Sequence, residues 1–138
     1  MTVPYGLSTD VALPFEEAVA RSREELAKEG FGILTEIDVR ETLKKKLGVD
    51  FRPYVILGAC QPPLAHEALE AELEVGLLLP CNVAVWETGP GTSVVAAFDL
   101  MAMTTLARRP EAIRPIAEKV REKMSRVIQR LAAAPAAS

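Results

Sequence analysis

Apolar residues recur along this chain with two different spacings, and the spacing changes several times. Residues 5–11 and 31–37 alternate between opposite faces with a period of two, which is typical of β-strands. Between them the spacing of three to four predicts a helix that begins at Pro14 and ends at Gly30. One face of this predicted helix is mainly apolar: Phe15, Val19, Ser22 and Leu26.

A second helix is predicted directly after residues 31–37. Asp38 and Glu41 have the spacing of a capping box, which bonds free backbone N–H groups at a helix start. Lys44–Lys46 and Gly48 mark its end, where positive charge and a left-handed residue are favourable. The lysine run has two interpretations, an anion site or a solvated last turn, and the second is favoured. The apolar stripe of this helix is narrow: Val39, Leu43 and Leu47.

The middle of the chain predicts the centre of a sheet. Residues 54–60 form an almost continuous apolar run, typical of a central strand, and a helix is predicted over residues 62–72. Residues 81–86 and 92–98 predict two strands joined by the hairpin signal Thr88-Gly89-Pro90-Gly91. This hairpin makes at least one pair antiparallel and excludes a purely parallel, doubly wound sheet.

The clearest helical pattern lies near the C-terminus, after a turn of helix expected from Asp99 to Leu106. It predicts a regular helix from Pro115 to Leu131, whose stripe serves either the core or a second subunit, with the core favoured. Residues 132–138 are rich in alanine and are expected to be a disordered tail. The apolar stripe comprises Ile113, Ile116, Ala117, Val120, Met124, Val127, Ile128 and Leu131.

The predicted order is strand, helix, strand, helix, strand, helix, strand, strand, helix. A length of 138 residues with 49% hydrophobic side chains fits one domain with one core, over residues 1–131. We therefore expect an α+β fold, a two-layer sandwich with helices on one face of a mixed or mostly antiparallel sheet of about five strands. The other face of the sheet is then either polar or buried in an oligomer.

Composition restricts the partners of this domain. A net charge of -3 argues against nucleic acid, whose phosphates need clustered lysine and arginine. No signal-peptide pattern occurs, and no apolar run approaches the roughly 18 residues that span a bilayer, so we expect no membrane partner and a cytoplasmic location. The chain has one asparagine and two glutamines, a scarcity that resembles thermophile proteins. Two of these amides, Gln61 and Asn82, lie directly beside the two cysteines.

The only cysteines, the only histidine and the only asparagine fall close together in the middle of the chain. Cys60 is expected at the end of a strand just before a helix, where the positive helix end favours a thiolate. His66 follows one turn into that helix, and Glu70 has the spacing to orient its ring. Cys81 and Asn82 open the next predicted strand. Nucleotide-binding, serine-triad and zinc motifs are absent.

Four interpretations of these residues remain open. In the first, Cys60 and Cys81 are small residues of the core and His66 lies on the surface; burial in the core is common for free cysteine. Alternatively, Cys60 or Cys81 is a catalytic thiolate for thiol or persulfide chemistry. A soft metal or haem site is a third interpretation, but structural zinc normally has four ligands and only three soft ones occur, so no metal is expected. A Cys60–Cys81 disulfide is the fourth, and it needs Cα atoms within about 7 Å.

Two stretches, TEIDVRETLKKKLGVDFRPYVILGACQPPLAHEALEAE and GLLLPCNVAV, resemble a bacterial and archaeal family known as domain of unknown function family 302. The resemblance covers nearly the whole chain, from Tyr5 to the helix after Asp99. Its most distinctive parts are residues 35–38, 57–60, 62–65 and 79–82. It implies a compact α+β domain of TATA-binding-protein-like architecture, commonly a homodimer, and it matches motif cysteines at Cys60 and Cys81 without implying a reaction.

These observations support one leading hypothesis and two alternatives. The leading one is a homodimer that binds a small ligand near Cys60, His66, Cys81 and Asn82. The first alternative is a thiol-dependent enzyme or sulfur carrier that uses Cys60 or Cys81. The second is a structural or interaction protein without a chemical site. The sequence indicates no particular cofactor, ligand or reaction.

Overall fold

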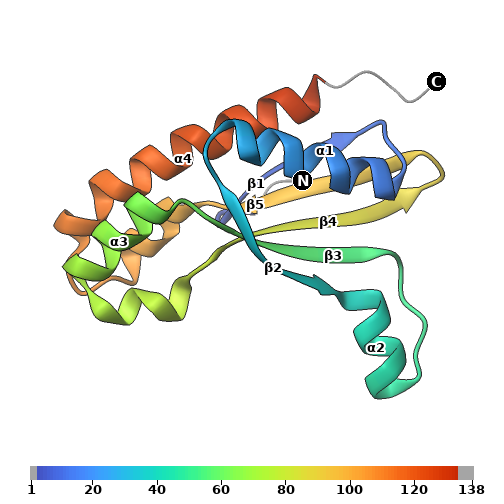
Figure 1. Ribbon diagram of the computed structural model, residues 1–138, viewed down its shortest axis with the longest axis horizontal. Helices are drawn as coiled ribbons and strands as arrows, with labels where there is room; N and C mark the ends of the chain where they lie inside the picture. Colours follow the sequence, from blue (N-terminus) through green and yellow to red (C-terminus); the bar gives the residue numbers. More distant parts are fainter. Residues whose placement is uncertain (1–2, 134–138) are drawn as a thin grey trace.

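Four antiparallel pairings join the five strands into one sheet, in the order β1-β5-β4-β3-β2 (Figure 1). The computed structural model describes residues 3–133. The predicted order of strands and helices is confirmed, and the sheet is entirely antiparallel. Of the two short 3₁₀ helices, η2 is the turn of helix that was expected from Asp99 to Leu106, and η1 was not predicted. The elements are β1 Gly6–Val11, α1 Phe15–Lys28, β2 Gly32–Asp38, α2 Val39–Leu47, β3 Tyr54–Cys60, α3 Pro62–Ala71, η1 Leu73–Leu78, β4 Cys81–Gly89, β5 Thr92–Phe98, η2 Leu100–Thr105 and α4 Pro110–Ala132.

Local sequence defines the ends of the first two helices. Gly30 has φ of 85°, a left-handed conformation, and closes α1 with backbone hydrogen bonds back into its last turn. At the start of α2, the Asp38 side chain accepts a hydrogen bond from the Glu41 N–H at 2.9 Å. Gly48 ends α2 with φ of 68°. All three positions agree with the sequence prediction.

The long helix α4 begins at Pro110. The sequence pattern predicted a later start, at Pro115. Pro115 lies inside the helix, and its ring nitrogen donates no bond to the carbonyl of Glu111. That carbonyl belongs to the exposed first turn, where water can replace the missing donor. The disordered tail was predicted from residue 132, but Ala132 is the last residue of α4 and Ala133 its C-cap; the rest of the predicted tail, from residue 134, lies outside the described residues. Within residues 3–133, no helix combines the length and apolar character that crossing a membrane requires.

The helices α1 and α4 cover one face of the sheet and enclose the hydrophobic core with it (Figure 1). Because side chains alternate along a strand, every second residue of β3, β4 and β5 points into this core. The predicted stripe of α4 is buried there, which confirms its use in the core. The buried strand residues are Val55, Leu57, Ala59, Cys81, Val83, Val85, Ser93, Val95 and Ala97. The buried residues of α1 are Ala18, Ser22, Glu25 and Leu26, while the predicted Phe15 and Val19 are half-buried.

The contact between α1 and α4 contains a buried carboxylate that the apolar pattern did not predict. Glu25 is 2% exposed, and its carboxylate accepts hydrogen bonds from Lys28 at 2.8 Å and from Arg130. Glu29, one turn later, is held by Arg126 at 2.9 Å and by Arg130 at 3.0 Å. Burial alone would raise the pKa of Glu25, but these hydrogen bonds outweigh it and lower that pKa. The hydrogen bond from Arg126 is the main cause of the lowered pKa of Glu29.

No helix of the described chain covers the middle of the opposite side of the sheet, which we call the open face (Figure 1). An exposed antiparallel face is normally polar, but this one is largely apolar. Tyr54 and Trp86 are register partners on it, and their rings stack with centroids 5.4 Å apart. The strand register assigns these residues to the open face: Thr35, Ile37, Tyr54, Ile56, Gly58, Asn82, Ala84, Trp86, Val94, Ala96 and Phe98.

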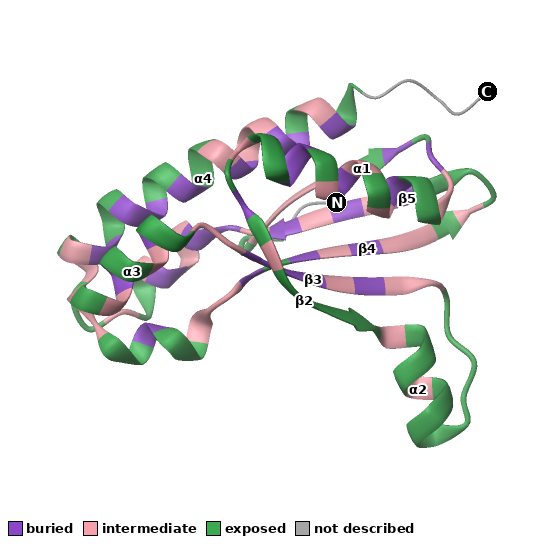
Figure 2. Ribbon diagram, viewed as in Figure 1, coloured by how far each residue is buried: buried purple, intermediate pink, exposed green. Residues whose placement is uncertain are grey.

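Residues 39–51, which we call the arm, project from the end of β2 away from α1 and α4 (Figure 1). The arm contains α2 and the chain that follows it, and none of the residues of α2 is buried (Figure 2). Leu47 is 68% exposed, Val49 45% and Phe51 42%. The predicted stripe of α2 therefore has no core to pack against within the described chain.

Candidate functional site

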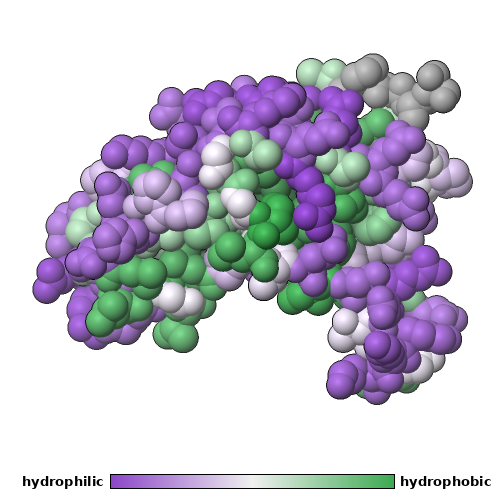
Figure 3. Space-filling view, viewed as in Figure 1, coloured by the Kyte–Doolittle hydropathy of each residue, from purple (hydrophilic) through white to green (hydrophobic). Residues whose placement is uncertain are grey.

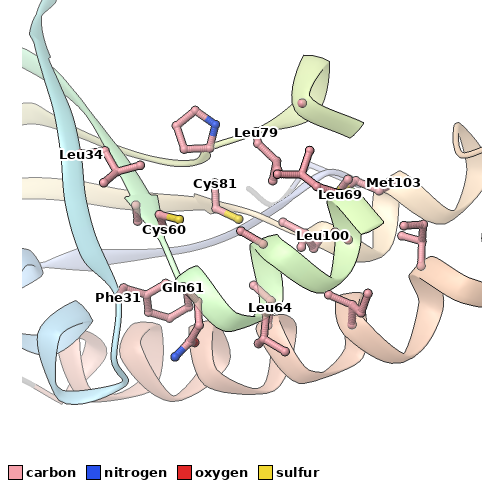
Figure 4. A pocket seen from close by; sticks show the side chains of 18 residues that line it. Phe31, Leu34, Cys60, Gln61, Leu64, Leu69, Leu79, Cys81, Leu100 and Met103 are labelled. Carbon is pink, nitrogen blue, oxygen red and sulfur yellow. The ribbon is translucent and has the colours of Figure 1, made fainter. Parts of the chain in front are cut away.

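An apolar cavity of about 320 Å³ lies where β3 ends and β4 begins, between these strands and the helices α3 and α4 (Figure 4). Its walls come from seven elements between β2 and α4, so the cavity exists only in the folded chain. The lining residues are Phe31, Leu34, Ala59, Cys60, Gln61, Leu64, Ala65, Ala68, Leu69, Gly76, Leu79, Pro80, Cys81, Leu100, Met103, Ile113, Ile116 and Val120.

The size and lining of this cavity are those of a small-molecule site. Ligand pockets in proteins range from about 300 to 1,000 Å³ and are lined mostly by apolar side chains with a few polar groups. An engineered apolar cavity of about 150 Å³ already binds benzene. A cavity of about 320 Å³ is thus large enough for a compact organic molecule.

Cys60 and Cys81 lie at this end of two neighbouring strands, and both line the cavity (Figure 4). The register pairs Ala59 with Cys81, so Cys60 is one residue beyond the partner of Cys81. Cys81 is 5% exposed and Cys60 is half-buried, and both thiols are free. Burial raises the pKa of the Cys81 thiol to about 12, and the nearby Cys60 adds to the effect. Cys81 is therefore a neutral thiol near pH 7.

Gln61 contributes the polar part of the cavity wall. Its Nε2 donates a hydrogen bond to the carbonyl of Glu29 at 3.2 Å, which fixes the orientation of the amide because a carbonyl oxygen only accepts. The Oε1 of Gln61 is buried and has no hydrogen-bond partner. Buried polar atoms are almost always paired, so this oxygen is a candidate acceptor for a bound molecule.

The structure brings Cys60 and Cys81 together but not His66 or Asn82. The side chain of His66 is 76% exposed, and its Nε2 lies 3.3 Å from Oε1 of Glu70, the expected partner. His66 stands two residues from each of the buried Leu64 and Ala68, so a helical turn directs it outward. Asn82 follows Cys81 in β4 and is exposed on the open face, since successive strand residues point to opposite sides.

The described residues show no convergence of metal ligands. Within residues 3–133, no group of three or more His, Cys, Asp and Glu side chains has the proximity to hold a metal ion. The chemistry that this site offers comes from two thiols, one amide and an apolar wall.

Only part of this wall was predictable from the sequence. Periodicity predicts the helix over residues 62–72 that supplies Leu64, Ala65, Ala68 and Leu69, but Leu34 and Met103 come from distant elements that periodicity does not connect. A signal for Gln61 was present, since this scarce amide directly follows Cys60.

Comparisons with known proteins agree with this architecture. The family model described as "Domain of unknown function DUF302" matches residues 7–131. The chain is also similar to the "uncharacterized conserved protein DUF302 from Bacillus stearothermophilus", a crystal structure with 30% sequence identity and a TM-score of 0.83. That match covers 94% of this chain and 99% of the other. No curated protein matches. The resemblance found in the sequence is confirmed, and the chain belongs to the DUF302 family.

Proposed function

We propose that this protein binds a small, largely apolar molecule in the cavity beside Cys60 and Cys81. The observation that carries this proposal is an apolar cavity of about 320 Å³ whose lining residues include Gln61, and the Oε1 of Gln61 is buried and unpaired. An apolar ligand gains by leaving water, and the cavity is already formed without it.

The wall also indicates the chemistry of the ligand. The Gln61 Oε1 fits one hydrogen-bond donor, and the remaining surface fits carbon or other polarizable atoms, including the neutral thiol of Cys81. By the scale of benzene in a cavity of about 150 Å³, the ligand has about a dozen non-hydrogen atoms. A strongly charged molecule does not fit, since no charged side chain lines the cavity.

The proposal is tested with a matched pair of probes, indole and indene, which differ by one N–H donor. Calorimetric titration of the wild-type protein is expected to show binding of both, with indole about tenfold tighter because Gln61 accepts its hydrogen bond. Gln61→Met is expected to abolish this preference while indene still binds. Native mass spectrometry of freshly purified protein then identifies any natural occupant.

Filling the cavity provides the second arm of the test. Ala65 lines the cavity, and Ala65→Phe is expected to weaken both probes at least tenfold by occupying their space. Ala20 lies on the exposed side of α1 away from the cavity, so Ala20→Phe is the matched control and leaves binding unchanged. Equal affinities in wild type and Ala65→Phe would contradict the proposal.

Thiol chemistry is the second candidate function. Cys81 is buried and Cys60 is only half-buried, so Cys60 is the better candidate for the reactive thiol. The raised pKa of Cys81 makes that thiol a poor source of thiolate near pH 7. Cys60 is the more exposed of the two and precedes the first residues of α3. Titration of the native protein with a thiol reagent between pH 7 and pH 9 checks this. We expect one fast thiol, lost in Cys60→Ser and retained in Cys81→Ser.

A further inference from the structure

We infer that the molecule bound in the cavity is a small amphipathic anion, such as a short fatty acid, whose charged head lies outside the cavity in a groove between α3 and α4. The inference rests on the proposed function, because the apolar part of this molecule occupies the same cavity. It adds the chemical class of the ligand and a second binding site, which is formed mainly by lysines of α4.

The groove, which we call the basic groove, is a surface hollow of about 380 Å³ beside the first turn of α3. Two of its residues, Gln61 and Leu64, also line the cavity, so the groove adjoins the cavity at these side chains. Figure 3 shows hydrophilic surface over α4 and hydrophobic surface below it, between α3 and the arm. The residues of the basic groove are Gln61, Pro63, Leu64, Lys119, Glu122, Lys123 and Arg126.

The basic groove is positively charged although the chain as a whole is negative. Its lining holds three basic residues and one acidic residue, a net charge of +2, whereas the whole chain has a net charge of -3. The acidic residue, Glu122, pairs with Arg126 at 3.3 Å, and Arg126 also bonds Glu29 at 2.9 Å. The charge that remains uncompensated in the groove therefore belongs to Lys119 and Lys123.

Lys119 and Lys123 lie one helical turn apart on α4 and have no carboxylate partner among the described residues. The ion pairs of this helix are made by Arg121, Arg126 and Arg130 instead. Lys123 is nevertheless half-buried. Like charges four residues apart weaken a helix, so helix stability does not account for this pair of lysines. A bound anion would compensate both charges.

The start of α3 adds to the attraction for negative charge. Pro63 and Leu64 belong to its first turn, and no side chain caps this end of the helix. The partial positive charge at the start of a helix favours an anion there. The lysines and the helix end thus act on the same hollow in the surface.

The cavity and the basic groove select opposite parts of one molecule. No charged side chain lines the cavity, so the charged group of a ligand is excluded from it. In the groove, an anionic head accepts charge-assisted hydrogen bonds from Lys119 and Lys123. The apolar chain then extends past Gln61, which lines both spaces, into the cavity.

Octanoate and 1-octanol test the inference, because they share an eight-carbon chain and differ in the charge of the head group. Calorimetric titration near pH 7 is expected to show that octanoate binds about tenfold tighter. A head group inside the cavity would give the opposite order, because an unpaired carboxylate is costly to bury. Added salt is expected to weaken the binding of octanoate and not that of 1-octanol.

Substitution of the lysines by methionine removes the charge and keeps a long apolar side chain. Lys123→Met is expected to weaken octanoate about fivefold, and its combination with Lys119→Met to remove the preference for octanoate over 1-octanol. Lys46→Met is the matched control, since it removes the same charge from the exposed arm, and it leaves both affinities unchanged. Melting temperatures confirm that each variant is folded. Ala65→Phe, which fills the cavity, is expected to weaken both probes.

Three results would overturn the inference and leave the cavity as a site for uncharged molecules. The first is octanoate that binds no tighter than 1-octanol. The second is octanoate affinity that the double lysine variant leaves unchanged. The third is octanoate binding that Ala65→Phe does not weaken, because the chain then lies elsewhere. Failure of the proposed function is recognised separately, since neither indene nor 1-octanol then binds, and the inference falls with it.

Discussion

The two faces of the sheet carry similar side chains in very different surroundings. On β3, Leu57 points into the helical layer and is fully buried, while its neighbour Ile56 points to the open face and is half-buried. The same contrast separates Val83 from Ala84 on β4. An apolar run without alternation, such as residues 54–60, is typical of a strand covered on both sides, yet the described chain covers only one. The difference shows that the apolar pattern of a strand does not reveal whether its own chain covers both faces of the sheet.

The largest expected effect comes from truncating one large apolar side chain to alanine on each face of the sheet. Leu57→Ala is expected to lower the free energy of unfolding by about 3–4 kcal/mol, because it leaves a cavity in the core. Ile56→Ala is expected to cost about 1 kcal/mol in dilute solution, since much of that side chain is not packed. Urea unfolding at two protein concentrations measures both. Equal costs for the two variants would contradict the contrast between the faces.

Gly58 is buried and closely packed, whereas the other residues assigned above to the open face are half-buried or exposed. A Cβ atom there would overlap the hydroxyl of Thr35 and lie 2.9 Å from Cγ of Pro80. Gly58→Ala is therefore expected to lower the free energy of unfolding by about 2–3 kcal/mol through overpacking. Gly32→Ala is the control on the neighbouring strand, where nothing lies within 4 Å of the new Cβ, and its expected change is below about 0.5 kcal/mol. Thermal unfolding compares them, and a tolerated Gly58→Ala would show that this part of the face is adaptable.

The helical layer has a polar component with no counterpart on the open face. Arg130→Ala is expected to cost about 2 kcal/mol, because Glu25 then keeps only Lys28 as a partner in a buried position. Arg23→Ala removes an exposed pair with Glu36 and is the control, with an expected cost below about 0.5 kcal/mol. Chemical denaturation at pH 7 measures both values. Equal losses would mean that the burial of Glu25 has little energetic weight.

The same cluster gives stability a defined pH dependence. The folded pKa values of Glu25 and Glu29 lie below their ordinary value of 4.5, so their stabilisation is fully present above that pH. It is lost as the pH falls below 4.5 and through the folded pKa values, when both carboxylates become protonated. Melting temperatures between pH 7 and pH 3 should therefore fall more steeply for the wild type than for Arg130→Ala, and parallel curves would contradict this.

The smallest effect is expected on the arm. Asp38→Ala removes the N-terminal cap of α2, a change worth about 1 kcal/mol to a helix. Because no residue of α2 is buried, global unfolding is expected to change by less than about 0.5 kcal/mol. Far-UV circular dichroism follows the local loss of helix, and urea unfolding follows the global effect. A large global loss would mean that the arm is part of the core's cooperative unit.

The sequence predicted the elements of this fold because each depends on neighbouring residues. The caps at Asp38, Gly30 and Gly48 and the hairpin at residues 88–91 involve only local backbone geometry. The position of β1 beside β5 was not predictable, since these strands are distant in sequence and period alone does not specify a partner. The fold class, the helix-covered face and the antiparallel hairpin were predicted correctly, whereas strand order required the structure.

The candidate site was predictable only in part, and for the same reason. Cys60 and Cys81 stood out by their scarcity, and the structure places both at one cavity. The cavity itself arises from long-range packing, and the buried Glu25 depends on Arg130, which is 105 residues away in the chain. His66 stood out by scarcity too, but its helical position directs it to solvent. The scarcity of cysteine and histidine pointed to residues with useful chemistry, but the packing of the fold determines which of them lie together.

The isolation of the arm has a consequence for how its backbone exchanges hydrogen with solvent. The amides of α2 are held by intrahelical bonds with no buried side chain above them, so they open by local fraying rather than by global unfolding. Their exchange is therefore expected to be fast in the isolated chain and to slow if another surface covers the arm. Deuterium uptake over residues 43–47 thus reports the occupancy of the arm directly, in an unmodified protein and at any concentration.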